Sequence, residues 1–431
     1  MKRTSPLVWI MALIAPMIFL WNDASAVPAF ARKYHTACST CHIAFPARNG
    51  FGEAFRNNGY RFPENTDEEM VKEEPIKLGS DSYKKVFPDA IWPSDIPNMP
   101  SLGFLTKVGV SSEKDNGKYR NSQFDQELDV FFAGTITNQI SYIGDFAIAE
   151  NEPTMLGRLQ LLWTFKPGVT LVVGTVGFPE QFDMISMSGG GDKNGYAAQM
   201  PNPNKGAELR LAGPVGTGTS YALLAGLGRN SQTAGTEPNA ASAGGSLADT
   251  KYGRATFKIG GNGLLSGAGG KFGNQVIGLD DSITFGVDLF HSSNGANTNA
   301  ADYTAGLTKN AYEGDVRINY GNARIVAQYA RFNEVIADSL TDLSSGKREA
   351  ISLEADYWFY PWLFGAIRYE NLKDDLNGEY RKVIPGIGAL LRPNCKIGFE
   401  YVSVSKDTFT DLAVSSYRPT NSLNFYTQLG F

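Results

Sequence analysis

The sequence predicts a mainly β fold, a transmembrane antiparallel β-barrel of about 16 strands that follows a small helical N-terminal head. From about residue 101 onward, short segments alternate apolar and polar side chains, which is the period of a β-strand. The polar stretches between these segments are alternately short and long, like the turns and loops at the two ends of such a barrel. The composition agrees, because 47 Gly, 12% aromatic residues and only 19% charged residues are typical of β structure with many turns.

Residues 1–26 have the pattern of a secretory signal peptide. Basic residues precede an apolar run at positions 7–21, and small residues at 24–26 offer a cleavage site. The run is shorter than the ~20 residues that a membrane-spanning helix needs. We therefore expect an exported chain in which a head (27–100) precedes the barrel (101–431), located in the outer membrane of a Gram-negative bacterium.

The charge and the cysteine content exclude several classes of function. The formal net charge is −5, with only 39 Lys and Arg residues and no basic run, which argues against a nucleic-acid binder. Three cysteines in 431 residues cannot build a disulfide scaffold. An exported chain with this alternation is also not expected to be a soluble cytoplasmic enzyme.

The most specific motif of the chain is Cys38-Ser39-Thr40-Cys41-His42. Two thiols at this spacing, followed at once by a histidine, are typical of covalent haem c attachment with the histidine as axial ligand of the iron. A zinc site would need further Cys or His residues, and a thioredoxin-like CxxC would need a βαβ pattern around it. We predict one haem c, bound through Cys38 and Cys41 and ligated by His42.

The second axial ligand has three candidates in the head. His35 lies three residues before the first cysteine of the motif, so its own backbone restricts its reach to the opposite haem face. Met70 sits in an acidic stretch that is typical of a solvated helix. Met99 is held between Pro97 and Pro100, where a rigid backbone could present a thioether. We favour Met99, against the simpler interpretation that it fills a gap in packing.

Aromatic residues after the motif predict a surface that could cover a haem. Phe51 and Phe55 stand at the i, i+4 spacing of one helix face, between Phe45 and Tyr60. The same pattern also fits an ordinary amphipathic helix that ends at a glycine.

The strands of the barrel are predicted from the alternation of their side chains. Leu159 and Leu161 share one face, for example, while Arg158 and Gln160 lie on the other. A soluble sandwich would turn its polar face outward and a porin would turn it inward, so alternation alone does not decide between them. The predicted strands begin near residues 102, 124, 140, 155, 169, 206, 219, 251, 282, 312, 323, 348, 362, 382, 395 and 422.

Three further features favour the barrel. Short turns such as 166–168 alternate with long polar loops at 178–204, 229–249 and 292–310. Aromatic residues cluster near strand ends, as in the interfacial girdles of a barrel. The last strand ends on Phe431, which resembles the assembly signal of bacterial outer-membrane barrels.

Three other features of the barrel sequence are the stretch 260–281, the lone Cys395 and the charges expected inside the barrel. The stretch 260–281 is too long and too rich in glycine for an ordinary short turn. Cys395 begins a strand, and we interpret it as a lone thiol because no partner cysteine remains. The charges expected inside the barrel balance one another: Arg158, Arg210, Arg254, Arg317 and Arg368 against Glu208, Asp315, Asp356 and Glu370.

The head also resembles a known family. Four stretches carry the resemblance: PAFARKY at 28–34, CSTCH at 38–42, FP at 45–46 and FGEAFRNNGY at 51–60. They are similar to the fused monohaem porin-cytochromes of iron-oxidising bacteria, which join one cytochrome c head to an outer-membrane barrel. The resemblance implies electron uptake from extracellular ferrous iron. Related heads occur in metal-reducing bacteria, which leaves the direction of electron flow open.

Two functions from different classes follow from these observations. The first is an electron conduit that passes single electrons between an extracellular donor, Fe²⁺, and a soluble periplasmic cytochrome or copper protein. The balanced charges inside the barrel favour this function. The second is a diffusion porin or transporter with a haem-bearing plug or sensor. An enzyme such as an iron oxidase ranks third, because the sequence offers no base, nucleophile or second metal cluster beside the motif.

Overall fold

The structure is a computed structural model, and the residues it describes exclude the predicted signal peptide, Phe45 and Met99. It describes residues 29–44, 47–62, 70, 76–77, 85–86, 88, 95–96, 101–115, 118–136, 139–149, 155–178, 198, 200, 205–229, 249–265, 274, 276–297, 307–337, 343–375, 378–408 and 421–430.

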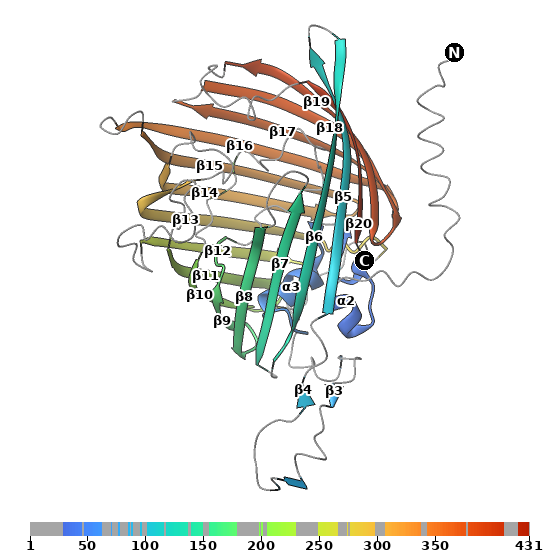
Figure 1. The fold of residues 1–431 in the computed structure, drawn as a ribbon, viewed down its shortest axis with the longest axis vertical. Helices are drawn as coiled ribbons and strands as arrows, with labels where there is room; N and C mark the ends of the chain where they lie inside the picture. Colours follow the sequence, from blue (N-terminus) through green and yellow to red (C-terminus); the bar gives the residue numbers. More distant parts are fainter. Residues whose placement is uncertain are drawn as a thin grey trace.

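Sixteen antiparallel strands form a closed barrel, which confirms the predicted fold class and strand number (Figure 1). Each strand pairs with the next along the chain, and β20 pairs with β5 to close the wall, with Leu423 opposite Ser112. The strands are β5 (Ser101–Asp115), β6 (Lys118–Thr135), β7 (Ile140–Ala149), β8 (Met155–Lys166), β9 (Val169–Gly174), β10 (Lys205–Pro214), β11 (Thr219–Arg229), β12 (Thr250–Gly260), β13 (Ser282–Asn297), β14 (Leu307–Tyr320), β15 (Ala323–Ala337), β16 (Leu343–Tyr360), β17 (Leu363–Asp374), β18 (Gly378–Arg392), β19 (Cys395–Asp407) and β20 (Ser422–Gly430).

Most strands begin within one residue of the predicted position, and four begin four to six residues earlier. These four are β6, β14, β16 and β18, and each extends at the end of the barrel that carries the long loops. The added residues, such as 118–123 and 343–347, are mostly polar or small. The alternation that marks a strand is absent there, because those residues project beyond the apolar band.

The strands turn their apolar side chains outward and their charges inward. Leu161 is 45% exposed and Leu289 is 54% exposed, whereas the carboxyl groups of Asp288 and Glu354 lie in residues with no exposed surface. A soluble β-sandwich would show the opposite arrangement. The outer face therefore has the character of a surface that contacts lipid.

The N-terminal segment forms short elements rather than the separate helical domain that the sequence predicts. Its elements with described bounds are α2 (Ala29–Tyr34), a 3₁₀ turn (Cys38–Thr40), β1 (His42–Ala44), β2 (Ala47–Arg48), α3 (Gly50–Asn57), β3 (Ile76–Lys77) and β4 (Asp95–Ile96). The helix expected around Phe51 and Phe55 is confirmed as α3. The expectation of a self-contained helical head is not supported, because apolar residues of this segment, among them Phe30, Tyr60 and Ile43, pack against residues of the barrel wall.

In the described part of the chain, no helix combines the length and the apolar character needed to cross a membrane.

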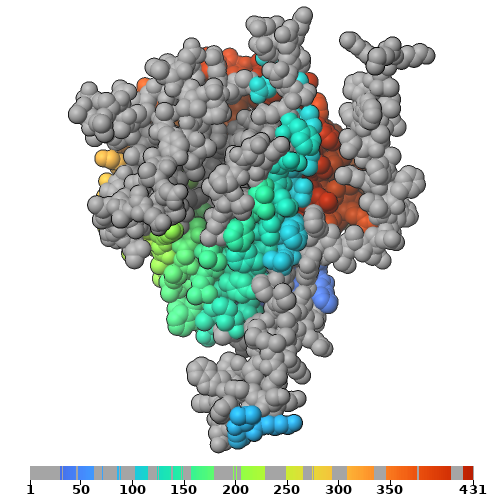
Figure 2. Space-filling view, viewed as in Figure 1, coloured from blue at the N-terminus to red at the C-terminus, as the bar shows by residue number. Residues whose placement is uncertain are grey.

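The two N-terminal helices lie at the end of the barrel that carries the short turns (Figure 1). Helix α2 contacts β5 and β6, and α3 contacts β10. In the space-filling view, strands of the wall are exposed on the face toward the viewer, and a small blue patch of the N-terminal segment is visible at its lower right edge (Figure 2).

Candidate functional site: a plug in the barrel lumen

Residues 29–62, apart from 45 and 46, form a unit that we call the plug, because it is bonded to the inner face of the wall. Ser141 Oγ of β7 donates to the Gly59 carbonyl at 2.6 Å, and the Gly168 N–H of the β8–β9 turn donates to Asn58 Oδ1 at 3.3 Å. On the other side, Asn57 Nδ2 donates to the Leu264 carbonyl at 2.7 Å. The plug is therefore tied to widely separated parts of the wall.

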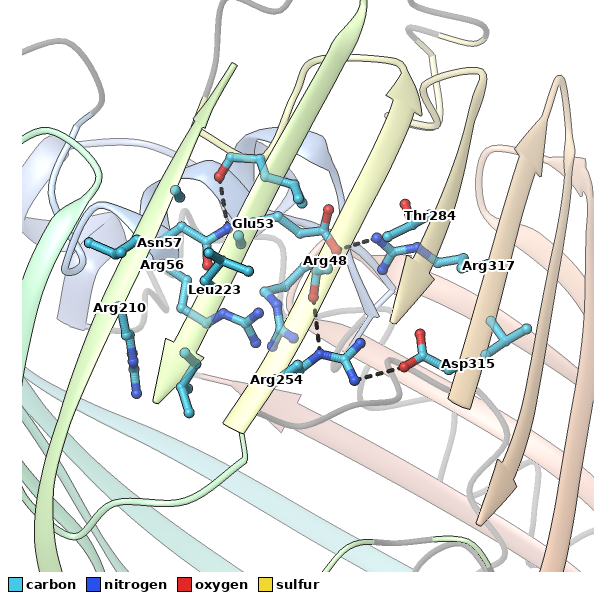
Figure 3. Close-up of a pocket in the computed structure, with 17 residues that line it drawn as sticks. Arg48, Glu53, Arg56, Asn57, Arg210, Leu223, Arg254, Thr284, Asp315 and Arg317 are labelled. Carbon is cyan, nitrogen blue, oxygen red and sulfur yellow. Dashed lines mark hydrogen bonds and ion pairs between the residues drawn. The ribbon is translucent and has the colours of Figure 1, made fainter. Parts of the chain in front are cut away.

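An ionic cluster, which we call the latch, joins α3 to the wall (Figure 3). Glu53 of the plug forms an ion pair with Arg317 of β14, and its second carboxylate oxygen lies 3.6 Å from Nζ of Lys258 in β12. Lys258 Nζ also lies 2.9 Å from Asp280 Oδ2. All these groups are largely buried, so the attraction between them is weakly screened by water.

The electrostatics of the latch show in the pKa of Glu53. Burial alone would raise this pKa. The positive charges of Arg317 and Lys258 have the larger, opposite effect, and they lower the pKa to about 2. Burial likewise raises the pKa of Asp280, and Lys258 lowers it below its ordinary value. Both carboxyl groups are therefore ionised at neutral pH, and the latch is a charged, compensated cluster.

The described residues of the segment between β12 and β13, which are 261–265, 274 and 276–281, contact the plug. Its Leu264 carbonyl accepts the bond from Asn57, and its Leu279 is buried in one apolar cluster with Ile43 and Ala44. Trp358 of β16 completes this cluster from the wall side. These residues thus help to hold the plug against the wall, whereas the sequence indicated only that the segment was no ordinary turn.

The CxxCH motif forms a tight turn that is packed against α3. Cys38, Ser39 and Thr40 form the 3₁₀ turn, and the Cys41 N–H donates to the Cys38 carbonyl at 3.2 Å. A Cβ atom at Gly52 would overlap the Cys41 carbonyl. The helix and the motif therefore approach more closely than any other residue at this position would permit.

Asn49 connects the motif to the helix, and sequence reasoning missed it. Its side-chain Oδ1 accepts from the Gly52 N–H at 2.9 Å and so caps α3. Its Nδ2 donates to the carbonyls of Ser39 and Thr40 at 3.1 and 3.0 Å, and its own N–H donates to the Cys41 carbonyl at 3.0 Å. An asparagine directly before a predicted helix is a cap signal, which could have indicated this position.

The two thiols of the motif are not activated. Burial raises the pKa of Cys38, and burial together with the neighbouring Cys38 raises that of Cys41 to about 12. A redox-active CxxC motif needs a lowered thiol pKa, because the thiolate is the reactive form. This argues against the thiol–disulfide alternative.

Two of the three candidate distal ligands, His35 and Met70, belong to the described residues. His35 is exposed just after α2, and Met70 is 40% exposed. Met99 lies outside the described residues, so its proposed role stays a prediction. Across the ranges that the structure describes, no group of three or more His, Cys, Asp or Glu side chains could hold a metal ion.

The predicted aromatic face exists, and it packs within the plug and against the wall. The ring centroids of Phe51 and Phe55 lie 6.3 Å apart on α3, so the two residues share one helix face as their spacing predicted. Phe30 stacks on Tyr60 with ring centroids 5.3 Å apart, and both rings pack against buried residues of the wall. Phe62 contacts Phe51 at 5.3 Å. Aromatic packing thus contributes to holding the plug in place.

The predicted inward charges are confirmed, and each predicted residue has an ionic partner. The pairs are Arg158 with Asp145, Arg210 with Glu208, Arg254 with Asp315, Arg317 with Glu53, Arg368 with Glu370, and Asp356 with Arg324. Cys395 begins β19 and is partly buried.

Comparisons with known proteins support the fold. No family model and no curated protein matches the sequence. The anion-selective porin from Comamonas acidovorans has a TM-score of 0.53 at 11% identity, covering 77% of this chain and 99% of that chain. OmpF of Salmonella typhi in complex with daunomycin has a TM-score of 0.49 at 12% identity, covering 77% and 97%. The likeness to the Comamonas porin shows that this chain has a porin-like fold.

Proposed function

We propose that this protein is an outer-membrane porin-type channel whose lumen is obstructed at the short-turn end by a plug that carries one haem c. The observation that carries the proposal is the buried latch, in which Glu53 of the plug pairs with Arg317 and Lys258 of the wall. The apolar outer face of the barrel and the export pattern at 1–26 support a location in the outer membrane of a Gram-negative bacterium.

The donor set of the plug fits a haem c. Cys38 and Cys41 would hold it covalently, His42 would be its axial ligand, and Met99 is our proposed distal ligand. Such a group supplies one-electron redox chemistry when bound. Asn49 and Gly52 keep the motif on a tight turn against α3, so this chain fixes the attachment point relative to the wall.

A conductance measurement tests the channel function. In planar lipid bilayers, we expect single channels of the full-length protein to conduct weakly. Glu53→Gln should raise the conductance, because it removes the buried carboxylate that joins α3 to Arg317 and Lys258 of the wall. Glu349→Gln is the matched control, since Glu349 pairs with Arg331 at 3.8 Å in a largely exposed position. Equal conductance for the wild type and both variants would contradict the plugged channel.

The electron conduit is the second candidate, and the position of the CxxCH turn favours it. The turn is part of the plug, which is hydrogen-bonded to the wall. An electron from an external donor would therefore travel a shorter distance to this turn than to a separate periplasmic head. Its partners would be extracellular Fe²⁺ and a soluble periplasmic cytochrome or copper protein. Electron flow in the opposite direction, towards an extracellular metal oxide, uses the same arrangement.

Liposomes separate the two candidates. The protein is reconstituted with its long loops outward, and ferrous iron, which does not cross the lipid itself, is added outside. A change in the haem absorption spectrum supports the conduit. Free passage of small solutes with no spectral change supports the channel alone.

A further inference from the structure

The outer face of the wall carries a group of basic residues at its long-loop end, which we call the outer patch. It consists of Lys205 of β10, Lys251 of β12 and His291 of β13, all of them exposed. Strands β10 to β13 are consecutive neighbours in the wall (Figure 1). Lys251 and His291 stand directly opposite each other across β12 and β13, so their Cβ atoms lie about 4.5–5.5 Å apart on one face.

The outer patch lies at the edge of the apolar band. The outward-facing residues of β13 from Ile283 to Leu289 are apolar and 38–54% exposed, and His291 is the next residue of that row. Lys251 has the same place in β12, whose outward row ends at Ile259. At the usual rise and tilt of a strand, the stretch from Lys251 to Ile259 spans roughly 20 Å along the membrane normal. The basic groups are therefore level with the lipid headgroups.

The lysines of the outer patch differ from the outward cations on the other side of the barrel. Arg331 of β15 lies 3.8 Å from Glu349, its register partner in β16. Within the described ranges, neither Lys205 nor Lys251 has an acidic partner. Their ammonium groups are therefore available to an anion from outside the protein.

His291 is held in one orientation by Asn310 of β14. Its Nδ1 donates to Asn310 Oδ1 at 2.8 Å, because an amide oxygen can only accept a hydrogen bond. The other ring nitrogen, Nε2, is then left for a further ligand. When the ring is protonated, Nε2 also donates, beside the ammonium group of Lys251.

The place and the charge of the outer patch select its partner. Long loops mark the extracellular end of such a barrel, so the patch meets the outer leaflet. Basic side chains at this depth attract anionic lipid headgroups, and a lysine binds a phosphate group as a point charge. At the short-turn end, by contrast, the outward rows of β12 and β13 end in Ile259 and Ile283, which favour neutral lipid chains.

We propose that Lys205, Lys251 and His291 bind the phosphate groups of a phosphorylated glycolipid of the lipid A type in the outer leaflet. The bound lipid covers the β10–β13 side of the wall. The proposal goes beyond the proposed function, because it requires neither the haem nor conduction.

Native mass spectrometry of the full-length holoprotein in a nonionic detergent tests the proposal. The probe is lipid A with two phosphate groups, and the comparison is the same lipid without phosphate. We expect the wild type to bind the phosphorylated lipid more tightly. Replacing Lys205, Lys251 and His291 together by Gln should weaken this binding about tenfold or more, because each basic group near an anionic headgroup contributes to the affinity.

Two control variants separate the outer patch from general charge effects. Lys166→Gln removes an exposed cation at the short-turn end and should leave the affinity unchanged. Lys205→Arg with Lys251→Arg keeps both charges and should keep most of the affinity.

Heat-modifiable migration shows that each variant forms a folded barrel. Equal affinity for lipid A in the triple variant and the wild type would overturn the proposal. So would equal binding of the lipid without phosphate, or an equal loss in Lys166→Gln. Failure of the conductance test leaves this result unaffected.

Discussion

The wall and the plug are stabilised in different ways. Each wall strand is hydrogen-bonded along its length to two neighbours, and its side chains alternate between lipid and lumen. The plug depends on a small number of specific contacts, namely a buried latch, a cap on α3 and an aromatic cluster. The wall should therefore stay folded after single changes that undock the plug or remove its proposed haem.

The largest contrast is expected for the haem motif. Replacing Cys38 and Cys41 by Ala together should abolish covalent haem, because the proposed attachment of haem c needs both thiols. The barrel should still fold, since neither residue belongs to a wall strand. A pyridine haemochrome assay measures the first result and heat-modifiable migration the second. Retention of haem c in this double variant would refute the assignment.

Breaking the latch comes next. Glu53→Gln should weaken plug docking by about 3 kcal/mol or more, because it removes the buried carboxylate that faces Arg317 and Lys258. Hydrogen exchange at the Gly168 N–H of the β8–β9 turn, which donates to Asn58 Oδ1 of the plug, measures docking. Glu349→Gln should change it by less than about 1 kcal/mol. Equal exchange in both variants would show that the latch does not hold the plug.

The latch also gives docking a direction of pH dependence. Arg317 and Lys258 outweigh the effect of burial and lower the pKa of Glu53 from 4.5 to about 2. Because the folded pKa is lowered, the contribution of Glu53 is complete above pH 4.5 and is lost as the pH falls through about 2. Protection of the plug amides, taken relative to their intrinsic exchange rates at each pH, should fall over that range in the wild type and change less in Glu53→Gln.

A methyl group between helix and motif should have a smaller effect. Gly52→Ala places a Cβ against the Cys41 carbonyl, so we expect a loss of about 1–3 kcal/mol in plug stability. Gly314→Ala on β14 is the matched control, because a Cβ there meets no atom within 4 Å. Thermal unfolding followed by haem absorbance compares the two, and an equal effect would exclude close packing as the cause.

The smallest effect is expected at the cap. Asn49→Ser keeps an oxygen that can cap α3 but loses the donors to the Ser39 and Thr40 carbonyls, at about 1–2 kcal/mol. Asn49→Ala loses the cap as well and should be worse by about 1 kcal/mol. The exchange rate of the Cys41 N–H reports both. Identical rates in the two variants would mean that the cap contributes nothing.

The same contrast explains what could be predicted from the sequence. Wall strands repeat a two-residue period, so Leu159 and Arg158 already indicate two faces of one strand, and the ends of strands are missed only where that period stops. The latch joins Glu53 to Arg317, which lie 264 residues apart, and no local pattern encodes such a contact. The CxxCH motif was visible because its chemistry is local, whereas its placement in the lumen depends on the fold.

A double-mutant cycle on the latch tests the central claim, that the plug is held inside the lumen, most directly. Glu53→Gln, Arg317→Gln and the double variant are compared by hydrogen exchange at the Gly168 N–H, which donates to Asn58 Oδ1 of the plug. If the two side chains are paired across plug and wall, the double variant loses less than the sum of the single losses, with a coupling of at least about 1 kcal/mol. If the losses in docking free energy of the two single variants add up to that of the double variant within about 0.5 kcal/mol, the account is contradicted. Such additivity is typical of residues that do not contact each other.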